Sequence, residues 1–136
     1  MREILFRGKR VDNGEWVYGS LLKQAGEYIS KDEVTPDECW ICGMRGEKAL
    51  IVSETIGQYT GLKDLHGTRI FEGDVVMKRT YHKKKPCEVV FGVGCFHCGW
   101  GGGSSTADHP YLLNDKRIEV IGNIWDNPAL LEGDKT

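Results

Sequence analysis

Short runs of apolar, β-favouring residues alternate with glycine, asparagine and aspartate turns along the first third of the chain. Runs at 4–6 and 16–18 flank Asp12-Asn13-Gly14, and Asn-Gly is the strongest short signal for a β-hairpin. A second hairpin is predicted between runs 20–22 and 28–30. The acidic stretch 32–38, which contains Pro36, is predicted to be a surface loop.

The same alternation continues to the other end of the sequence. A strand is predicted at 49–52, and runs 74–81 and 88–91 are predicted to pair across a basic turn. A closing strand is expected at 117–125. Asn127 and Pro128 then favour one helical turn, with Asn127 as its cap.

This pattern predicts an all-β protein, a small twisted β-barrel with hairpin extensions and at most a short C-terminal helical turn. A length of 136 residues fits a single domain over 1–136. The aromatic residues on the strand-like runs are expected to carry most of the buried apolar area. These residues are Trp16, Tyr18, Phe71, Phe91 and Trp125.

One stretch, residues 58–76, is denser in turn signals than any other. It holds Thr60-Gly61, His66-Gly67 and Glu72-Gly73-Asp74 between short β-favouring pieces. Glycine supplies the positive φ that tight turns need. Asp64 and Asp74 are predicted to fix these turns by accepting bonds from backbone amides. We therefore expect a compact corner that feeds the central strand of a small β domain.

Within this stretch the sequence QYTGLKDLHGTRIFEGD resembles the pattern Q-Y-T-G-L-K-D-x-x-G-x-x-I-x-E-G-D of the YopX-like family of phage and prophage proteins. The resemblance extends to residues 1–7 and 118–128, and so to both ends of the chain. It implies a mostly β fold and no established biochemical activity. It also implies the cytoplasm of an infected or lysogenic host cell.

Composition and net charge do not indicate a particular class of partner. The net charge is −2, so the whole molecule has no strong attraction to nucleic acid or to an anionic membrane. No apolar run of 18 residues occurs, and Arg2 charges the N-terminus. We expect a cytoplasmic protein with no membrane partner and no evident small-molecule substrate.

Four of the five cysteines form two C-x-x-C-G pairs. These candidate metal ligands are Cys39, Cys42, Cys95 and Cys98. If each pair formed a knuckle turn and the fold joined them, they would make a closed Cys₄ site for one structural zinc ion. Their separation exceeds that of compact zinc modules, so unliganded buried thiols are an equal alternative. A redox-active pair is a third interpretation, and His97 could replace one thiol as a ligand.

Positive charge is concentrated in one predicted hairpin turn. The candidate nucleic-acid-binding residues are Lys78, Arg79, Tyr81, Lys83, Lys84 and Lys85. The lysines and the arginine could follow a phosphate backbone while Tyr81 stacks on a base. A solvated turn that protects an edge strand is the simpler alternative. A third partner is the acidic stretch of a neighbouring subunit, at Asp32, Glu33, Asp37 and Glu38.

No catalytic motif stands out. The sequence lacks a G-x-S-x-G elbow, an H-E-x-x-H pair and a P-loop. Aromatic residues beside the cysteine pairs and glycine-rich edges make a homo-oligomer a reasonable expectation. We therefore predict a non-catalytic accessory protein that acts as a binding or assembly module. The alternative is a nucleic-acid-binding protein that uses the basic hairpin 78–85.

Overall fold

The fold was analysed in a computed structural model, which describes residues 2–78, 86–92, 94–99, 111–112 and 117–132. The chain divides into two compact units, Met1–Gln58 and Tyr59–Thr136, called here the N-terminal and C-terminal units. The first contains β1 (Phe6–Lys9), β2 (Trp16–Gln24), β3 (Tyr28–Ser30), β4 (Glu33–Val34), β5 (Glu38–Cys42), β6 (Lys48–Ile51) and the 3-10 turn η1 (Ser53–Thr55). Strand β7 (Gly57–Lys63) begins in the first unit and continues into the second. The second contains β8 (Arg69–Phe71), β9 (Asp74–Lys78), β10 (Pro86–Gly92), β11 (Cys95–Gly99), β12 (Tyr111–Leu112), β13 (Ile118–Asn123) and α1 (Ala129–Glu132).

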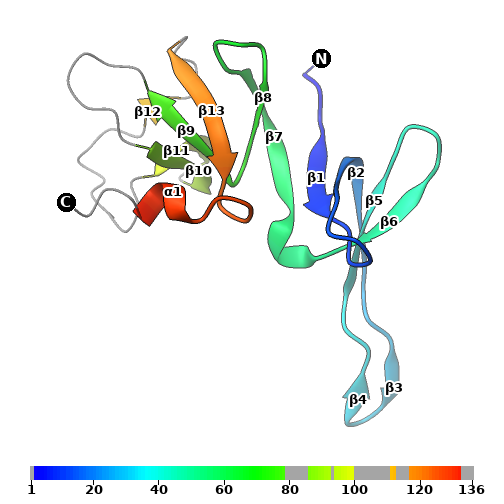
Figure 1. Cartoon of the computed structure of the whole chain (residues 1–136). Helices are drawn as coiled ribbons and strands as arrows, with labels where there is room; N and C mark the ends of the chain where they lie inside the picture. The colour runs from blue at the N-terminus through cyan, green and yellow to red at the C-terminus, as the bar shows by residue number, and fades with distance from the viewer. Residues whose placement is uncertain (1, 79–85, 93, 100–110, 113–116, 133–136) are drawn as a thin grey trace. The chain divides into compact units, whose positions relative to one another are not determined.

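The N-terminal unit is an antiparallel sheet in the order β6-β5-β2-β1, with the start of β7 added beside β1 (Figure 1). The predicted first hairpin is confirmed: β1 pairs with β2, and Gly14 takes a positive φ of 72° in the turn. A small core forms where Ile41, Ala49 and Ile51 are buried. Alternation along β2 directs Val17 toward this core. Trp16 and Tyr18 therefore lie on the other face of the sheet.

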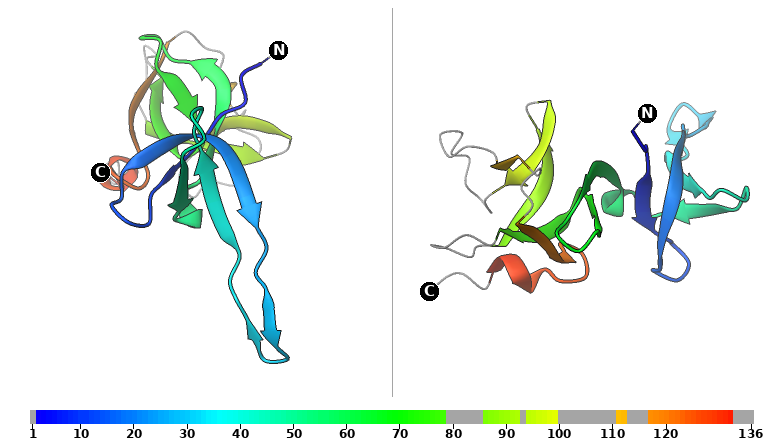
Figure 2. Two further views of the ribbon diagram at one scale, coloured as in Figure 1. Left: turned by 90° about the vertical axis from the view of Figure 1, so that its right-hand side faces the viewer. Right: turned by 90° about the horizontal axis from the view of Figure 1, so that it is seen from above.

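A long two-stranded arm extends from this sheet (Figures 1 and 2). Strand β2 pairs with β5 from Ser20↔Cys42 to Gln24↔Glu38, and the chain continues into the β3–β4 pair. The prediction that 20–22 pairs with 28–30 is therefore wrong. The backbone does not turn at Gly26, because its amide donates to Asp37 Oδ1 at 2.8 Å across the arm. A Cβ on this glycine would overlap the carbonyl oxygen of Thr35, so a glycine fits the crossing.

The predicted acidic loop at 32–38 is also wrong, because it contains β4 and leads into β5. Two hydrogen bonds, one between backbone groups and one from a backbone amide to a side chain, connect the base of the β3–β4 pair. The amide of Thr35 donates to the Glu27 carbonyl at 2.9 Å, and the Glu27 amide donates to the Thr35 hydroxyl at 2.6 Å. The arm is thus a continuous ribbon whose far end is β3 and β4. We call residues 27–38 the arm tip.

The C-terminal unit contains a second antiparallel sheet, in the order β12-β11-β10-β9-β13. Strand β9 lies between β10 and β13, so the turn-rich stretch leads into an internal strand, whereas the central strand of this sheet is β10. The core of this unit buries Ile70, Val76, Cys87, Val89, Cys98 and Ile118. The predicted pairing of 74–81 with 88–91 is confirmed by the register Glu88↔Val75.

The all-β class is confirmed by these sheets, and α1 is the only α-helix among the described residues. The barrel is not confirmed: in the described part of the chain each strand order is linear, with an edge strand at either end. The single domain over 1–136 stays a prediction. None of the described helices combines the length and the apolar character that a membrane crossing requires.

Two local predictions need correction. Phe71 is buried, but Tyr18 and Phe91 are exposed at 50% and 57%, so neither is a core residue. The helical turn forms as α1, yet Asn127 does not cap it with its side chain. Instead the Asn127 Oδ1 accepts from the amide of Asn123 at 3.3 Å, which closes the turn before the helix.

Candidate interaction surfaces

The turn-rich stretch 58–76 forms the corner of the C-terminal unit, and Asp64 is its main fixing point. Oδ1 of Asp64 accepts the amides of His66 and Thr68, both at 2.9 Å. Oδ2 accepts the amide of Val120 at 3.0 Å, so one carboxylate joins the β7–β8 turn to β13. Burial raises the pKa of Asp64, but the three backbone N–H donors outweigh it and hold the pKa below its ordinary value. The predicted turn-fixing role is confirmed.

Side-chain and backbone groups close the next turn of the corner, between β8 and β9. Oδ2 of Asp74 accepts the amide of Phe71 at 2.8 Å. Gly73 has a φ of 85° and packs under Trp125, whose ring a Cβ at this position would overlap. Its amide donates to Val89 and its carbonyl accepts from Ile124, each at 2.9 Å. The corner thereby fastens β9 to both of its neighbouring strands.

Strand β7 contributes a bulge to the corner. Its pairing with β8 shifts register between Tyr59 and Lys63, and Gly61 within the bulge has a φ of 88°. The hydroxyl of Thr60 donates to the Ile70 carbonyl at 2.8 Å and accepts the Leu62 amide at 3.2 Å. The side chains of Thr60, Asp64 and Asp74 therefore form hydrogen bonds with backbone groups, and the stretch 58–76 has a structural role in the C-terminal unit.

The cysteine pairs do not form knuckle turns, which corrects the local prediction for them. Cys39 and Cys42 lie in strand β5, and Cys95 and Cys98 lie in strand β11. Residues three apart in a strand direct their side chains to opposite faces of the sheet. The two thiols of one pair therefore do not converge on a single ion. Among the described residues, no group of three or more His, Cys, Asp or Glu side chains could hold a metal.

The four cysteines also differ in their surroundings. Cys98 is buried in the core of the C-terminal unit beside Cys87, whereas Cys39, Cys42 and Cys95 are half-buried. Strand geometry does not fit the closed tetrahedral site that structural zinc requires. Zinc binding by Cys39, Cys42, Cys95 and Cys98 stays a prediction, and metal analysis of protein purified without chelator tests it. Stability alone is a poor test at Cys98, because serine there would also place a hydroxyl in the core.

The candidate nucleic-acid residues fall mostly outside the described part of the chain. Lys78 is the last residue of β9, and its backbone pairs with Ile118. Arg79, Tyr81 and the lysines at 83–85 lie outside the described residues. The described ends of this segment, β9 and β10, are adjacent antiparallel strands with Met77 opposite Pro86.

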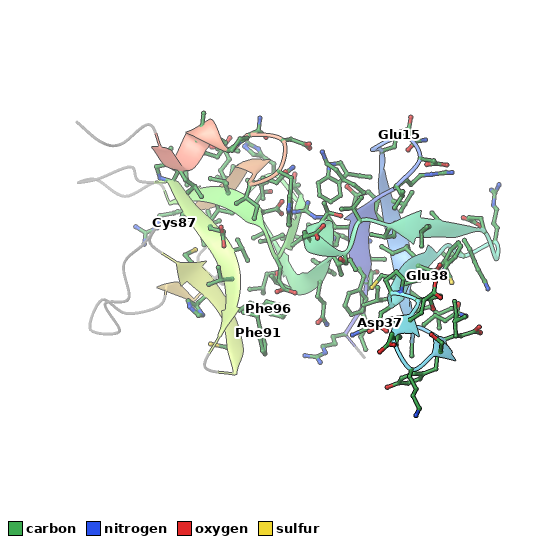
Figure 3. The ribbon with its side chains drawn as sticks, turned by 90° about the horizontal axis from the view of Figure 1, so that it is seen from below. Glu15, Asp37, Glu38, Cys87, Phe91 and Phe96 are labelled. Atoms are coloured by element: carbon green, nitrogen blue, oxygen red, sulfur yellow. The ribbon has the colours of Figure 1, made fainter. Side chains whose placement is uncertain are left out.

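The arm tip exposes three large apolar side chains, a feature that the sequence prediction missed. Tyr28 is 84% exposed, Ile29 62% and Val34 51%. Tyr28 stands opposite Val34, and the register of the ribbon shifts between Tyr28 and Ser30, so Ile29 lies in the irregular part of β3. Carboxylates surround them in the sequence, and Asp37 and Glu38 mark the start of β5 in Figure 3. The alternating residues on both sides of the Lys31-Asp32 turn were the signal for this hairpin.

A second exposed apolar feature lies on the β10–β11 hairpin. Phe91 and Phe96 stand directly opposite each other, with ring centroids 5.0 Å apart and an interplanar angle of 64°. Figure 3 shows the two rings side by side near the end of the hairpin. Phe96 packs against the core of the C-terminal unit, whereas Phe91 is exposed.

The fold is that of an all-β protein built from antiparallel sheets. Its longest sequence motif, at 58–74, forms a glycine-rich corner that holds strands together. The chain belongs to the YopX family: the family described as YopX protein matches residues 5–132. The crystal structure of protein EF1440 from Enterococcus faecalis has a similar fold, with a TM-score of 0.53 and 21% sequence identity over 96% of this chain and 99% of that one. No protein of curated function matches the chain. The phage origin and the host-cytoplasm location stay predictions.

Proposed function

We propose that the protein is a non-catalytic assembly module and that the arm tip is its contact surface, with a second copy of the chain as the partner. The observation that carries this proposal is the exposure of Tyr28, Ile29 and Val34 on one short two-stranded ribbon. A two-stranded ribbon with no covered face is marginally stable in water. Burying these side chains against a partner would stabilise the ribbon and supply the apolar centre of an interface.

Charge supports the choice of a second copy as the partner. The arm tip carries Glu27, Asp32, Glu33, Asp37 and Glu38 against a single basic residue, Lys31. Residues 78–85 of the same chain carry five lysine and arginine residues and no acidic one. Opposite charges on one chain favour association between copies and help to set its orientation. An interface of this kind weakens as salt rises, since exposed charges are screened.

The non-catalytic part of the proposal is supported by the use of the acidic side chains. Asp64 and Asp74 are the buried carboxylates of the described residues, and both accept backbone amides at turns. Carboxylates held in this way act in folding, whereas general acid–base catalysis requires a group within reach of a substrate proton. We therefore assign these residues to the scaffold.

Native mass spectrometry and light scattering over a concentration series test the assembly. The wild type is expected to form oligomers, and Tyr28→Ser combined with Ile29→Ser is expected to give folded monomers. Met44→Ser is the matched control, because Met44 is fully exposed in the β5–β6 turn, away from the arm tip. A monomeric wild type, or a double variant that assembles as the wild type does, would contradict the proposal.

A second candidate function, nucleic-acid binding, is favoured by the localisation of positive charge. Five of the 18 lysine and arginine residues lie within positions 78–85. Lys83→Glu with Lys84→Glu is expected to abolish binding to an oligonucleotide at low salt. Lys48→Glu with Lys63→Glu changes the net charge equally at two exposed positions and serves as the control. Equal loss in both variants would mean that only net charge matters, and retained binding in the first would exclude the segment.

A further inference from the structure

The aromatic pair on the β10–β11 hairpin has no role in the core that explains it. Cys87, Val89 and Phe91 share one face of β10 because they are two residues apart. The first two are buried at 4% and 1% exposure, whereas Phe91 is 57% exposed. The apolar face of the core sheet therefore continues onto the surface at the end of the hairpin. An exposed phenylalanine there offers a ring face to a partner.

Phe96 holds that ring in place. It packs against the core and meets the Phe91 ring in an edge-to-face arrangement, the favourable geometry for an aromatic pair. The hairpin turns through Gly92 and Gly94, and Gly94 has a φ of 80°. The pair is thus a preorganised platform.

The chemistry of the surroundings indicates the ligand. The described residues on this face of β10 and β11 are Cys87, Val89, Phe91, Phe96 and Cys98, and none of them carries a charge. A flat, uncharged ring is the partner that such a surface suits. The basic residues of 78–85 come just before Pro86 in the sequence, at the opposite end of β10 from Phe91. Five residues of extended strand separate Pro86 from Phe91, about 16 Å.

A ligand that combines flat rings with regularly spaced negative charge is a nucleic acid. Unpaired bases stack on aromatic side chains, whereas the bases of a duplex are occupied by their neighbours. We infer that Phe91, supported by Phe96, is a stacking site for an unpaired base of single-stranded nucleic acid. This inference rests on the second candidate function, and it adds the strand state of the ligand and the residue that contacts its bases.

Fluorescence anisotropy with a labelled oligothymidine, measured over a salt series, tests the inference. Phe91→Ala is expected to weaken binding at least 5-fold, in keeping with the loss of one base–aromatic stack. The slope of log affinity against log salt should stay the same, because no phosphate contact is lost. Phe91→Trp should retain the affinity. Met44→Ala, which removes a fully exposed apolar side chain from the β5–β6 turn, is the matched control and should bind as the wild type does.

The charge variant Lys83→Glu with Lys84→Glu distinguishes the inference from the function on which it rests. That variant should lose binding at low salt, since two counterion-releasing lysines are replaced by acidic residues. If it loses binding while Phe91→Ala binds normally, the stacking site is wrong and the charge-driven function stands. A wild type that does not bind the oligonucleotide overturns both. A Phe91→Ala variant that binds normally but changes its oligomeric state would assign the ring to a protein contact and overturn the inference.

Discussion

The two units of the chain use the same kind of strand in different ways. The N-terminal unit buries three residues in its core and extends an arm whose apolar side chains face water. Among the described residues, the C-terminal unit buries a cluster of six residues and fastens its internal strand from both sides through a glycine-rich corner. The family motif at 58–74 lies at that corner, whereas large apolar side chains are exposed on the arm and at Phe91 of the β10–β11 hairpin. The long family motif therefore builds the scaffold, and the exposed apolar side chains of the arm lie outside it.

The largest expected effect concerns the two cores. Ile118→Ala should lower the free energy of unfolding by about 4 kcal/mol, since Ile118 is completely buried and its neighbours cannot collapse into the cavity. Ile51→Ala in the smaller core should cost about 2 to 3 kcal/mol. Urea unfolding measures both. Met44→Ala in the exposed β5–β6 turn is the matched control and should stay within about 0.5 kcal/mol of the wild type. Equal costs at 118 and 51 would mean that the cores are equally tight.

A glycine pair within the corner gives the next effect. Gly73→Ala should cost about 3 kcal/mol, because it combines backbone strain at positive φ with overlap on the Trp125 ring. Gly67→Ala is the control: its φ of 83° is almost the same, but nothing lies within 4 Å of an added Cβ. The control should cost about 1 kcal/mol. If the two midpoints of urea unfolding coincide, packing under Trp125 contributes nothing to the stability of the corner.

Asp64 provides the pH-dependent effect. Its pKa is lower in the folded state, so its carboxylate stabilises the fold above the ordinary pKa, and this stabilisation is lost as pH falls through that value toward the folded pKa. Asp64→Asn should cost about 2 kcal/mol at pH 7, because the amide group cannot accept all three backbone N–H donors. The cost should shrink below about pH 4. Urea unfolding at pH 7 and pH 3 measures it, with exposed Glu54→Gln as the control.

The smallest expected effect concerns Cys39, which is half-buried in the N-terminal unit. Cys39→Ser should change the unfolding midpoint little if the thiol has no ligand, because Cys39 is not part of the buried core. Metal content measured on the wild type and on this variant gives the sharper readout. One zinc per wild-type chain that disappears with Cys39→Ser would support the zinc prediction. A metal-free wild type would contradict the zinc prediction and identify the cysteines as thiols without a metal.

Local signals predicted the structure well where a turn or a pairing depends on neighbouring residues. The Asn13-Gly14 hairpin, the turn-fixing roles of Asp64 and Asp74 and the β9–β10 pairing were all predictable from sequence. The arm was not, because Gly26 resembles a turn residue and only its close approach to Thr35 shows that the chain continues past it.

The failures at the candidate sites have similar causes. A C-x-x-C-G sequence has no conformation of its own, and cross-strand pairing places Cys39 opposite Ile51 and Cys98 opposite Val89, with both pairs in strands. The exposure of Phe91 also could not be read from its strand-like surroundings, since alternation assigns it to the core face. It is exposed because the strand extends past the core. Periodicity gives the face of a residue but not the edge of the core.

The position of β9 between two partners has a consequence for the order of events during synthesis. Strand β10 follows β9 closely along the chain, but β13 begins only at Ile118, and Trp125 must follow it to cover Gly73. A nascent chain that has emerged only as far as β10 carries an internal strand with one side unpaired and is open to wrong pairings until translation reaches β13. The β2–β5 ribbon needs no residue beyond Cys42. On the ribosome, the arm can therefore form before the corner that identifies the family.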